Sequence, residues 1–218
     1  MVRQYAFFFD ASQCSGCKAC QLACKDKHNL GPGMLWRRVY EVSGGSWRKQ
    51  GEAWVPSLRA YNISLACNHC QEPICASACP TQAIWKRADG IVFIEGNLCI
   101  GCRYCEWACP YGAIRFDGRT HLAVKCHFCF DLLGLGRPPA CVAACPARAL
   151  DFGDLEELQK RYGAIDRIFP LPDPAQVKPA LIIRPHKDAA SAEAERPKWP
   201  TGRNSEWPDG NGLRMIDL

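Results

Sequence analysis

Four cysteines stand close together in the middle of the chain, in the run Leu98-Cys-Ile-Gly-Cys-Arg-Tyr-Cys-Glu-Trp-Ala-Cys-Pro110. Cysteine thiolates are soft ligands, and soft ligands suit zinc or iron–sulfur clusters. Three thiolates separated by only two residues let a short loop wrap three corners of a compact cubane, which favours a cluster over a single zinc ion. The spacing C-x2-C-x2-C-x3-C-P is that of bacterial [4Fe–4S] sites, in which the fourth cysteine ligates a second cluster.

The same unit occurs four times, and an internal repeat of this kind determines the fold. The first group has the same gaps, C-x2-C-x2-C-x3-C, whereas the second has C-x2-C-x4-C-x3-C and the fourth C-x2-C-x11-C-x3-C. The second to fourth groups end in Cys-Pro, whereas Lys25 comes after the first. In chain order the groups are Cys14, Cys17, Cys20 and Cys24; Cys67, Cys70, Cys75 and Cys79; Cys99, Cys102, Cys105 and Cys109; and Cys126, Cys129, Cys141 and Cys145. All 16 cysteines fall into these groups, so the arithmetic supports four four-cysteine sites.

The ligand sets follow if each fourth cysteine serves the neighbouring cluster. The two central motifs then exchange their last ligands, and the first and last motifs do the same. The predicted sets are Cys67, Cys70, Cys75 with Cys109; Cys99, Cys102, Cys105 with Cys79; Cys14, Cys17, Cys20 with Cys145; and Cys126, Cys129, Cys141 with Cys24. Every iron corner would have a thiolate and no position would remain for a substrate. We therefore expect an electron relay without an active site of its own.

Composition limits the alternatives. The apolar fraction of 48% includes the 16 cysteines, so we expect the metal sites to supply much of the folding free energy and the apoprotein to be poorly folded. A disulfide scaffold is usually short, and a zinc-ribbon array has paired C-x2-C units. The cysteine triplets and the three Cys-Pro endings disfavour both.

The formal charge of +5 does not indicate a nucleic-acid partner. Four oxidised cubanes at about −2 each would bring the holoprotein to roughly −3, and no run of lysine or arginine appears. No segment approaches a membrane span, and Tyr5-Ala-Phe-Phe-Phe9 is too short for a signal-peptide core. The sequence alone therefore predicts a cytoplasmic protein unless a partner carries it elsewhere.

The predicted fold class is α+β, with two nested ferredoxin-like domains of the bacterial 2[4Fe–4S] type. We expect a strand at 3–10, a helix at Ala19–Lys27, and two small hairpins at 83–94 and 114–124. The outer domain would comprise 1–30 and 117–165, and the inner domain 61–116. Residues 31–60 are predicted to be an inserted hairpin that turns at Gly44-Gly45, and 166–218 an extended, proline-rich tail that wraps a partner, with one added strand at 181–183.

Several other residues are candidates for roles in partner contact, loop packing or the tuning of cluster potentials. The aromatic and arginine side chains of the insert, among them Trp36, Arg37, Trp47 and Trp54, face a partner subunit or pack over a cluster. His69 and His127 lie inside C-x2-C loops and are expected to shape the loop, not to ligate; Tyr104 and Trp107 are expected to pack against a cluster. The cations that flank the motifs either raise a cluster's potential or form a solvated surface: Lys86, Arg87, Arg103, Lys125 and Arg148.

The sequence resembles the iron–sulfur subunit of anaerobic dimethyl sulfoxide reductases. The resemblance rests on Gln4-Tyr-Ala-Phe-Phe-Phe-Asp10, Cys14-Ser-Gly-Cys-Lys-Ala-Cys-Gln-Leu-Ala-Cys-Lys-Asp26, Ser64-Leu-Ala-Cys-Asn-His-Cys70, Cys99-Ile-Gly-Cys-Arg-Tyr-Cys105 and Cys109-Pro-Tyr-Gly-Ala113. It extends from about residue 3 to residue 185. Some relatives carry tryptophan at the position of Cys102 and a [3Fe–4S] cluster; cysteine here implies four [4Fe–4S] clusters.

The resemblance implies two partners: a large catalytic subunit with a molybdenum or tungsten bis-pterin cofactor, and an integral membrane subunit that exchanges electrons with quinone. Co-export with the catalytic subunit would place this protein peripherally on the periplasmic face of the cytoplasmic membrane. Bridging subunits of polysulfide, thiosulfate, sulfite or formate enzymes look alike, and a free soluble polyferredoxin is the alternative from another class.

Overall fold

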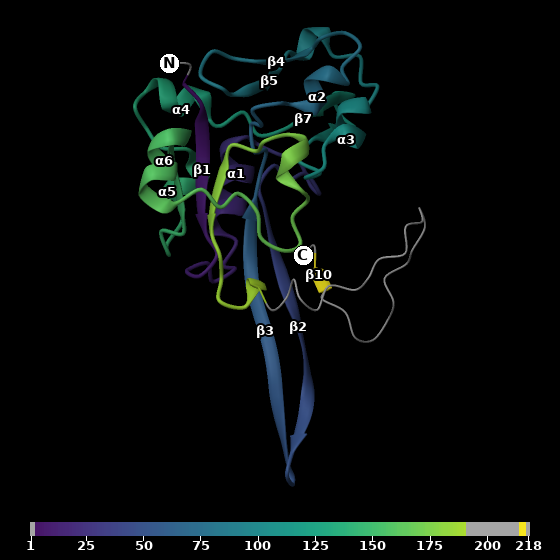
Figure 1. The fold of residues 1–218 in the computed structure, drawn as a ribbon. Coiled ribbons are helices and arrows are strands. Elements are labelled where there is room, and N and C mark those ends of the chain that lie inside the picture. The colour runs from purple at the N-terminus through teal and green to yellow at the C-terminus, as the bar shows by residue number, and fades with distance from the viewer. Residues whose placement is uncertain (1–2, 191–213, 217–218) are drawn as a thin grey trace.

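The computed structural model describes residues 3–190 and the strand at 214–216 (Figure 1). Its central strand is β1 (Tyr5–Asp10), flanked by β8 (Leu150–Asp154) in antiparallel and β9 (Leu181–Arg184) in parallel orientation. Residues 6–10 are all buried because β1 has a core on each face. Phe7 and Phe9 belong to the cysteine-containing core, and Ala6 and Phe8 pack against α6 (Leu155–Tyr162). The predicted strand at 3–10 is confirmed.

The segment after residue 165 packs within this body. Strand β9 is the added strand predicted at 181–183, and Ile182 and Ile183 are each 1% exposed. Ile168, Phe169 and Leu171 are also buried, and η2 (Pro174–Gln176) comes after them. The predicted extended tail is therefore wrong from 166 to about 189, because apolar residues between the prolines fill the core. The predicted tail residues 191–213 and 217–218 lie outside the described residues.

The helices beside the cysteines differ in length according to the residue after the last cysteine. Helix α1 (Ala19–Lys27) has nine residues and continues past Cys24, as predicted, since Lys25 can stay helical. Proline disfavours helical geometry in the residue before it. Accordingly, α3 (Tyr104–Ala108) ends before Cys109, which is extended. Three further short helices lie within the second and fourth motifs: α2 (Ile74–Ser77), which carries Cys75; α4 (Phe130–Gly134); and α5 (Ala140–Ala143), which carries Cys141.

Two small hairpins come after the second and third motifs. Strand β4 (Ile84–Lys86) pairs with β5 (Val92–Ile94), and β6 (Arg115–Asp117) pairs with β7 (Leu122–Val124). Both hairpins agree with the sequence-based prediction. Between them lies η1 (Gly96–Leu98). The hairpins meet in a core of their own, formed by Ile84, Val92, Cys105, Ile114 and Ala123.

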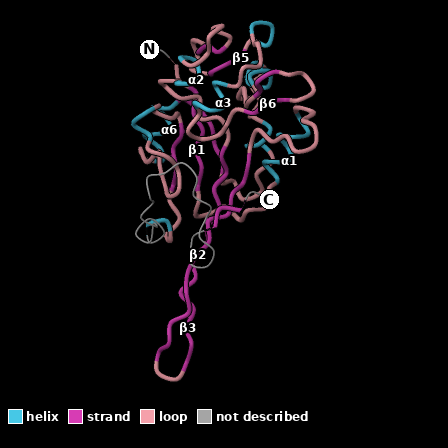
Figure 2. Tube along the Cα trace, turned by 90° about the vertical axis from the view of Figure 1, so that its right-hand side faces the viewer, coloured by secondary structure: helices cyan, strands magenta, loops and turns pink. Residues whose placement is uncertain are grey.

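A long hairpin projects from the body as an arm (Figures 1 and 2). Strands β2 (Arg38–Gln50) and β3 (Ala53–Leu65) pair over their whole length and turn at Gly51 and Glu52. The predicted turn at Gly44-Gly45 is wrong, because these glycines lie inside β2. Gly45 has a φ of +132°, and a Cβ there would lie 2.3 Å from the carbonyl oxygen of Ser57. The pair therefore permits close strand contact and does not reverse the chain.

The base and the end of the hairpin differ in burial. Val39, Val42 and Tyr61 are buried at the base, and β10 (Arg214–Ile216) pairs with β2 there. Near the turn, Trp47 and Trp54 are each 63% exposed. Among the described residues, no helix is both long and apolar enough to span a membrane.

Candidate iron–sulfur cluster sites

The four cysteine loops share one backbone bend. The residue before the second cysteine has a positive φ in every motif: Gly16 at +72°, His69 at +44°, Gly101 at +69° and Phe128 at +63°. Glycine adopts this left-handed conformation without steric cost, whereas His69 and Phe128 must be held in it by their surroundings. The third residue after Cys79, Cys109 and Cys145 is also left-handed, namely Gln82, Gly112 and Arg148. The sequence repeat is thus a repeat of local structure.

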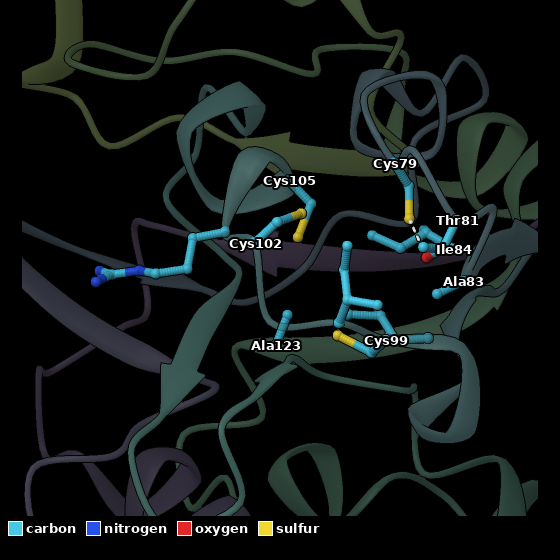
Figure 3. A pocket seen from close by; sticks show the side chains of 11 residues that line it. Cys79, Thr81, Ala83, Ile84, Cys99, Cys102, Cys105 and Ala123 are labelled. Carbon is cyan, nitrogen blue, oxygen red and sulfur yellow. Dashed lines mark hydrogen bonds between the residues drawn. The ribbon is translucent and has the colours of Figure 1, made fainter.

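Cysteines of different motifs line common cavities. Figure 3 shows Cys79, Cys99, Cys102 and Cys105 around one space, with Cys79 facing it from the side opposite Cys102 and Cys105. Together with the open solvent at its mouth, this space amounts to about 310 Å³; Ile84, Ile94 and Ala123 help to line it. Cys79 belongs to the second motif in the sequence, so the cavity joins it to the three leading cysteines of the third motif.

In two more cavities, three cysteines of one motif meet the last cysteine of another motif. One, of about 370 Å³, is lined by Cys67, Cys70 and Cys75 together with Cys109 of the third motif. Another, of about 310 Å³, is lined by Cys14, Cys17 and Cys20 together with Cys145 of the fourth motif. In three cases, therefore, the structure brings together the cysteines that the spacing predicts to form one set.

The remaining four cysteines interact electrostatically with one another. Burial raises the pKa of Cys24 to about 12, and the charges of Cys141 and Cys129 add to the effect. The pKa of Cys126 lies well above its usual value because of burial and the charges of Cys24, Cys67 and Cys141. Helix α1 carries Cys24 and packs against α5, which carries Cys141.

The ionisation of the thiols tests whether the sites fit a metal cluster. Burial, with the charges of neighbouring cysteines, raises the pKa of Cys14 and Cys105 to about 11 and that of Cys75 to about 12. Free thiols in these cavities would thus be protonated at neutral pH, and ionising several of them together requires a positively charged metal centre. Four soft sulfur donors in a mainly apolar cavity fit an iron–sulfur cluster.

A single metal ion fits the geometry less well. Within the described part of the chain, no three histidine, cysteine, aspartate or glutamate side chains come close enough to hold one ion. The cysteines stand around cavities, as a polynuclear group requires.

Cys79 has a different environment from the other thiols. Burial acts to raise its pKa, but hydrogen bonds from the Thr81 side chain and from backbone amides lower it overall. The Cys79 sulfur lies 3.6 Å from Thr81 Oγ1 (Figure 3). These hydrogen bonds therefore favour the ionised form of the Cys79 thiol.

The histidines inside the loops have structural partners. His69 is 0% exposed, and its Nδ1 accepts a hydrogen bond of 3.1 Å from the Val92 amide. The His127 ring packs edge-on against His28, which also contacts Trp36. His28 Nε2 lies 3.4 Å from Cys129 Sγ. No sequence signal marks His28, which stands four residues after a cysteine at the end of α1.

Two buried cations lie among the cysteines. Lys125 is 4% exposed and donates from Nζ to the carbonyl oxygens of Val92 and Cys126. Arg37, at the start of the insert, is 2% exposed. Trp36 and Arg37 therefore pack inside, whereas Trp47 and Trp54 of the same insert point outward.

The other flanking residues are closer to solvent. Arg103 lines the cavity of the third motif and pairs with Glu106 at 2.8 Å. Lys86 donates to the carbonyl oxygen of Cys70 at 3.2 Å. Tyr104 and Trp107 are 53% and 72% exposed, so the prediction that they pack against a cluster does not describe their position on α3.

Comparison with known proteins gives the family context of these sites. A family model described as a 4Fe–4S dicluster domain matches residues 58–155. That range includes the second, third and fourth cysteine motifs.

Three relatives match most of the sequence. The B chain of anaerobic dimethyl sulfoxide reductase from Escherichia coli (strain K12) is 44% identical over 189 residues, covering 87% of this protein and 92% of the relative. The B chain of polysulfide reductase from Wolinella succinogenes is 35% identical over 191 residues, with coverages of 86% and 97%. The B subunit of sulfite dehydrogenase from Allochromatium vinosum is 37% identical over 169 residues, with coverages of 71% and 70%.

Proposed function

Because this protein belongs to the family of iron–sulfur subunits typified by the B chain of anaerobic dimethyl sulfoxide reductase, we propose that it relays electrons between two partner subunits. One partner is an integral membrane subunit that reacts with quinone. The other is a catalytic subunit with a molybdenum or tungsten bis-pterin cofactor. The relay uses four [4Fe–4S] clusters, and the relay protein itself is not catalytic.

The main observation behind the proposal is that each of three cavities is lined by three cysteines of one motif and by the last cysteine of another. Cys79 joins the three leading cysteines of the third motif, Cys109 joins those of the second, and Cys145 joins those of the first. Such exchange of the fourth ligand is the arrangement of two-cluster ferredoxins, and it holds paired clusters close together. Cys24 with Cys126, Cys129 and Cys141 makes the fourth set.

A bound cluster in each set would accept and release one electron at a time. The cysteines sit in loops and short helices, and eight of the 16 are buried. Ile84, Ile94 and Ala123 exclude water from one side of the third-motif cavity. No cysteine is left over for a nucleophile, because all 16 belong to the four sets.

The domain proposal rests on the sheet contacts. The pairing of β1 with β8 supports an outer ferredoxin-like domain made of 1–30 and 117–165. The separate core formed by β4–β7 supports an inner domain at 61–116, to which β7 (Leu122–Val124) is added because Ala123 belongs to this core. The long hairpin interrupts the repeat between them, so we propose that it is an insertion.

The exposed end of the hairpin is the proposed partner-facing surface. In the pairing register Trp47 lies opposite Pro56, and Trp54 lies opposite Lys49. Side chains two residues apart on a strand share a face, so Trp47, Trp54 and Leu58 lie on one side of the arm. Tryptophan is enriched at protein interfaces. We place the assembled complex on the periplasmic face of the cytoplasmic membrane, reached by co-export with the catalytic subunit.

Metal analysis of the tagged protein, purified from gently solubilised host membranes, tests the proposal. We expect about 16 iron atoms or more per copy, molybdenum or tungsten, and two further polypeptides. About 16 iron atoms without a partner would favour a free polyferredoxin. Zinc in place of iron would refute both functions.

A related candidate has a specific basis. The polysulfide reductase and sulfite dehydrogenase relatives are both more than a third identical to this protein. A bridging subunit of a polysulfide, thiosulfate, sulfite or formate oxidoreductase would use the same cysteine sets. The substrate is a property of the catalytic partner, so the identity of the co-purified large subunit separates these candidates.

A further inference from the structure

Arg37 is a buried cation with unused hydrogen-bond donors. Its Nη1 donates to the carbonyl oxygen and to Oγ of Ser64, at 3.3 and 3.1 Å. Its Nε and Nη2 have no hydrogen-bond partner among the described residues, and the side chain is 2% exposed. One face of the guanidinium lies over the Phe7 ring, 4.6 Å from its centroid.

A buried charge of this kind needs an anion nearby. Burying a guanidinium without a counter-charge is costly, and breaking a buried ion pair is strongly destabilising. No carboxylate within the described residues forms an ion pair with Arg37. Burial alone would lower the pKa of Arg37, but the negative charges of Cys141, Cys20, Cys126 and Cys24 raise it. The Arg37 backbone amide also donates a hydrogen bond to the Cys24 sulfur.

These four cysteines belong to two of the proposed sets. Cys24, Cys126 and Cys141 are members of the fourth set, whereas Cys20 is a member of the first. Ser64 links Arg37 to Cys20. Its Oγ lies 3.4 Å from Cys20 Sγ and accepts a hydrogen bond from Arg37 Nη1. The Ser64 side of the guanidinium is therefore occupied, whereas its Nε and Nη2 donors have no partner among the described residues.

We propose that Arg37 sets the reduction potential of the cluster held by Cys24, Cys126, Cys129 and Cys141. The inference rests on the proposed function, since it requires a cluster in this set. Reduction adds one electron, and so one negative charge, to a group that is already anionic. A permanent cation in a low-dielectric core favours the reduced form. Guanidinium stays protonated throughout, so Arg37 supplies its charge without taking up or releasing a proton itself.

Lys27 provides a matched control near the same set. Its charge also acts on Cys129, but the Lys27 side chain is 31% exposed and pairs with Asp131 at 2.6 Å. Solvent and the partner carboxylate screen its field. Removing the Lys27 charge is therefore expected to change the potential much less than removing the Arg37 charge.

The test is an EPR-monitored redox titration of the assembled complex with Arg37→Gln, Arg37→Lys and Lys27→Gln. The relevant signal is the one altered by Cys126→Ser. At a fixed potential, Arg37→Gln should change the ratio of reduced to oxidised cluster by about tenfold or more toward oxidised, which is about 59 mV for a one-electron couple. Arg37→Lys and Lys27→Gln should each stay within about threefold of the parent.

The outcomes separate two roles of Arg37, charge and packing. The inference is overturned if the Arg37→Gln variant keeps its full iron content and its ratio of reduced to oxidised cluster is the same as in the parent. If Arg37→Gln loses this cluster and Arg37→Lys retains it at the parent potential, the charge is required and the inference stands. If both variants lose it, the guanidinium serves packing and the inference fails. Absence of any [4Fe–4S] signal in the parent complex would instead refute the proposed function.

Discussion

Asn62 of strand β3 holds the first cysteine loop: its Nδ2 donates a hydrogen bond of 3.4 Å to the carbonyl oxygen of Cys14. The Asn62 side chain also lies directly against Gly16, where an added Cβ would be 2.6 Å from Asn62 Oδ1. The base of the long hairpin thus shapes the loop of the first motif. A segment that interrupts the sequence repeat is part of the architecture of a candidate cluster site.

Replacing Gly16 by alanine should specifically weaken the first site. Gly16 has a φ of +72°, so a side chain there costs about 1–2 kcal/mol in backbone strain, and the clash with Asn62 adds to it. We expect the purified Gly16→Ala variant to lose about four iron atoms per copy and to unfold at lower urea concentration. Iron analysis and urea titration measure both effects.

Gly112→Ala is the matched control. Gly112 also has a positive φ, +56°, but nothing lies within 4 Å of an added Cβ. Gly112→Ala should be destabilised by the backbone strain alone and should keep its full iron content. Equal iron loss in both variants would show that contact with Asn62 does not matter.

The crossed ligand sets predict which cysteine variants resemble each other. Cys79 lines the cavity of the third motif although it belongs to the second motif in the sequence. Cys79→Ser and Cys102→Ser should therefore alter the same EPR signal, and Cys75→Ser should alter a different one. Four unaltered clusters in Cys102→Ser, or a shared signal for Cys79→Ser and Cys75→Ser, would refute the proposed sets.

Local signals in the sequence predicted the local structure well. The run from Tyr5 to Asp10 is apolar over one short stretch, and it is a buried strand. The helix predicted at Ala19–Lys27 is also present with the same bounds, as α1. The spacing also grouped the cysteines as the three cavities do, while ligation itself remains a prediction.

Features that depend on contacts distant in sequence were not predictable in the same way. Gly44-Gly45 looks like a turn, but the facing strand at Ser57 requires glycine for close approach. The proline-rich segment looks extended, and the strand at 181–183 was predicted within it, but nothing local showed that Ile168, Phe169 and Leu171 are buried in the core. Nothing local marks Arg37 as buried, because its environment includes Cys126 and Cys141, which are far from it in the sequence.

The exposed face of the hairpin should matter for assembly and not for cluster content. The double variant Trp47→Ser, Trp54→Ser removes the two large side chains from one face near the turn. We expect normal iron content with loss of the co-purifying subunits, because buried aromatic anchors dominate most interfaces. Quantitative co-purification at moderate salt is the measurement.

Val55→Ser is the control for the hairpin, since Val55 is 42% exposed on the opposite face of the same arm. It should co-purify with partners as the parent does. Loss of iron in the tryptophan variant would assign these residues to stability, and undiminished co-purification would remove the hairpin face from the proposed interface.

Acid should destabilise the protein through His69. The Val92 amide donates to His69 Nδ1, which must therefore be unprotonated, and burial with the Lys125 charge lowers the His69 pKa well below its usual value. The unfolded protein takes up a proton at this histidine near about pH 6.5, and the folded protein does not. The contribution of His69 to stability is thus complete above about pH 6.5 and declines as pH falls below it, by up to about 1.4 kcal/mol per pH unit.

The variant His69→Asn isolates this effect. Asparagine keeps an acceptor for Val92 and tolerates the φ of +44°, but it cannot titrate. In urea titrations that follow cluster absorbance from about pH 8 to about pH 5, the variant should lose less stability toward acid than the parent. Parallel pH profiles for the two proteins would show that another group causes the acid sensitivity.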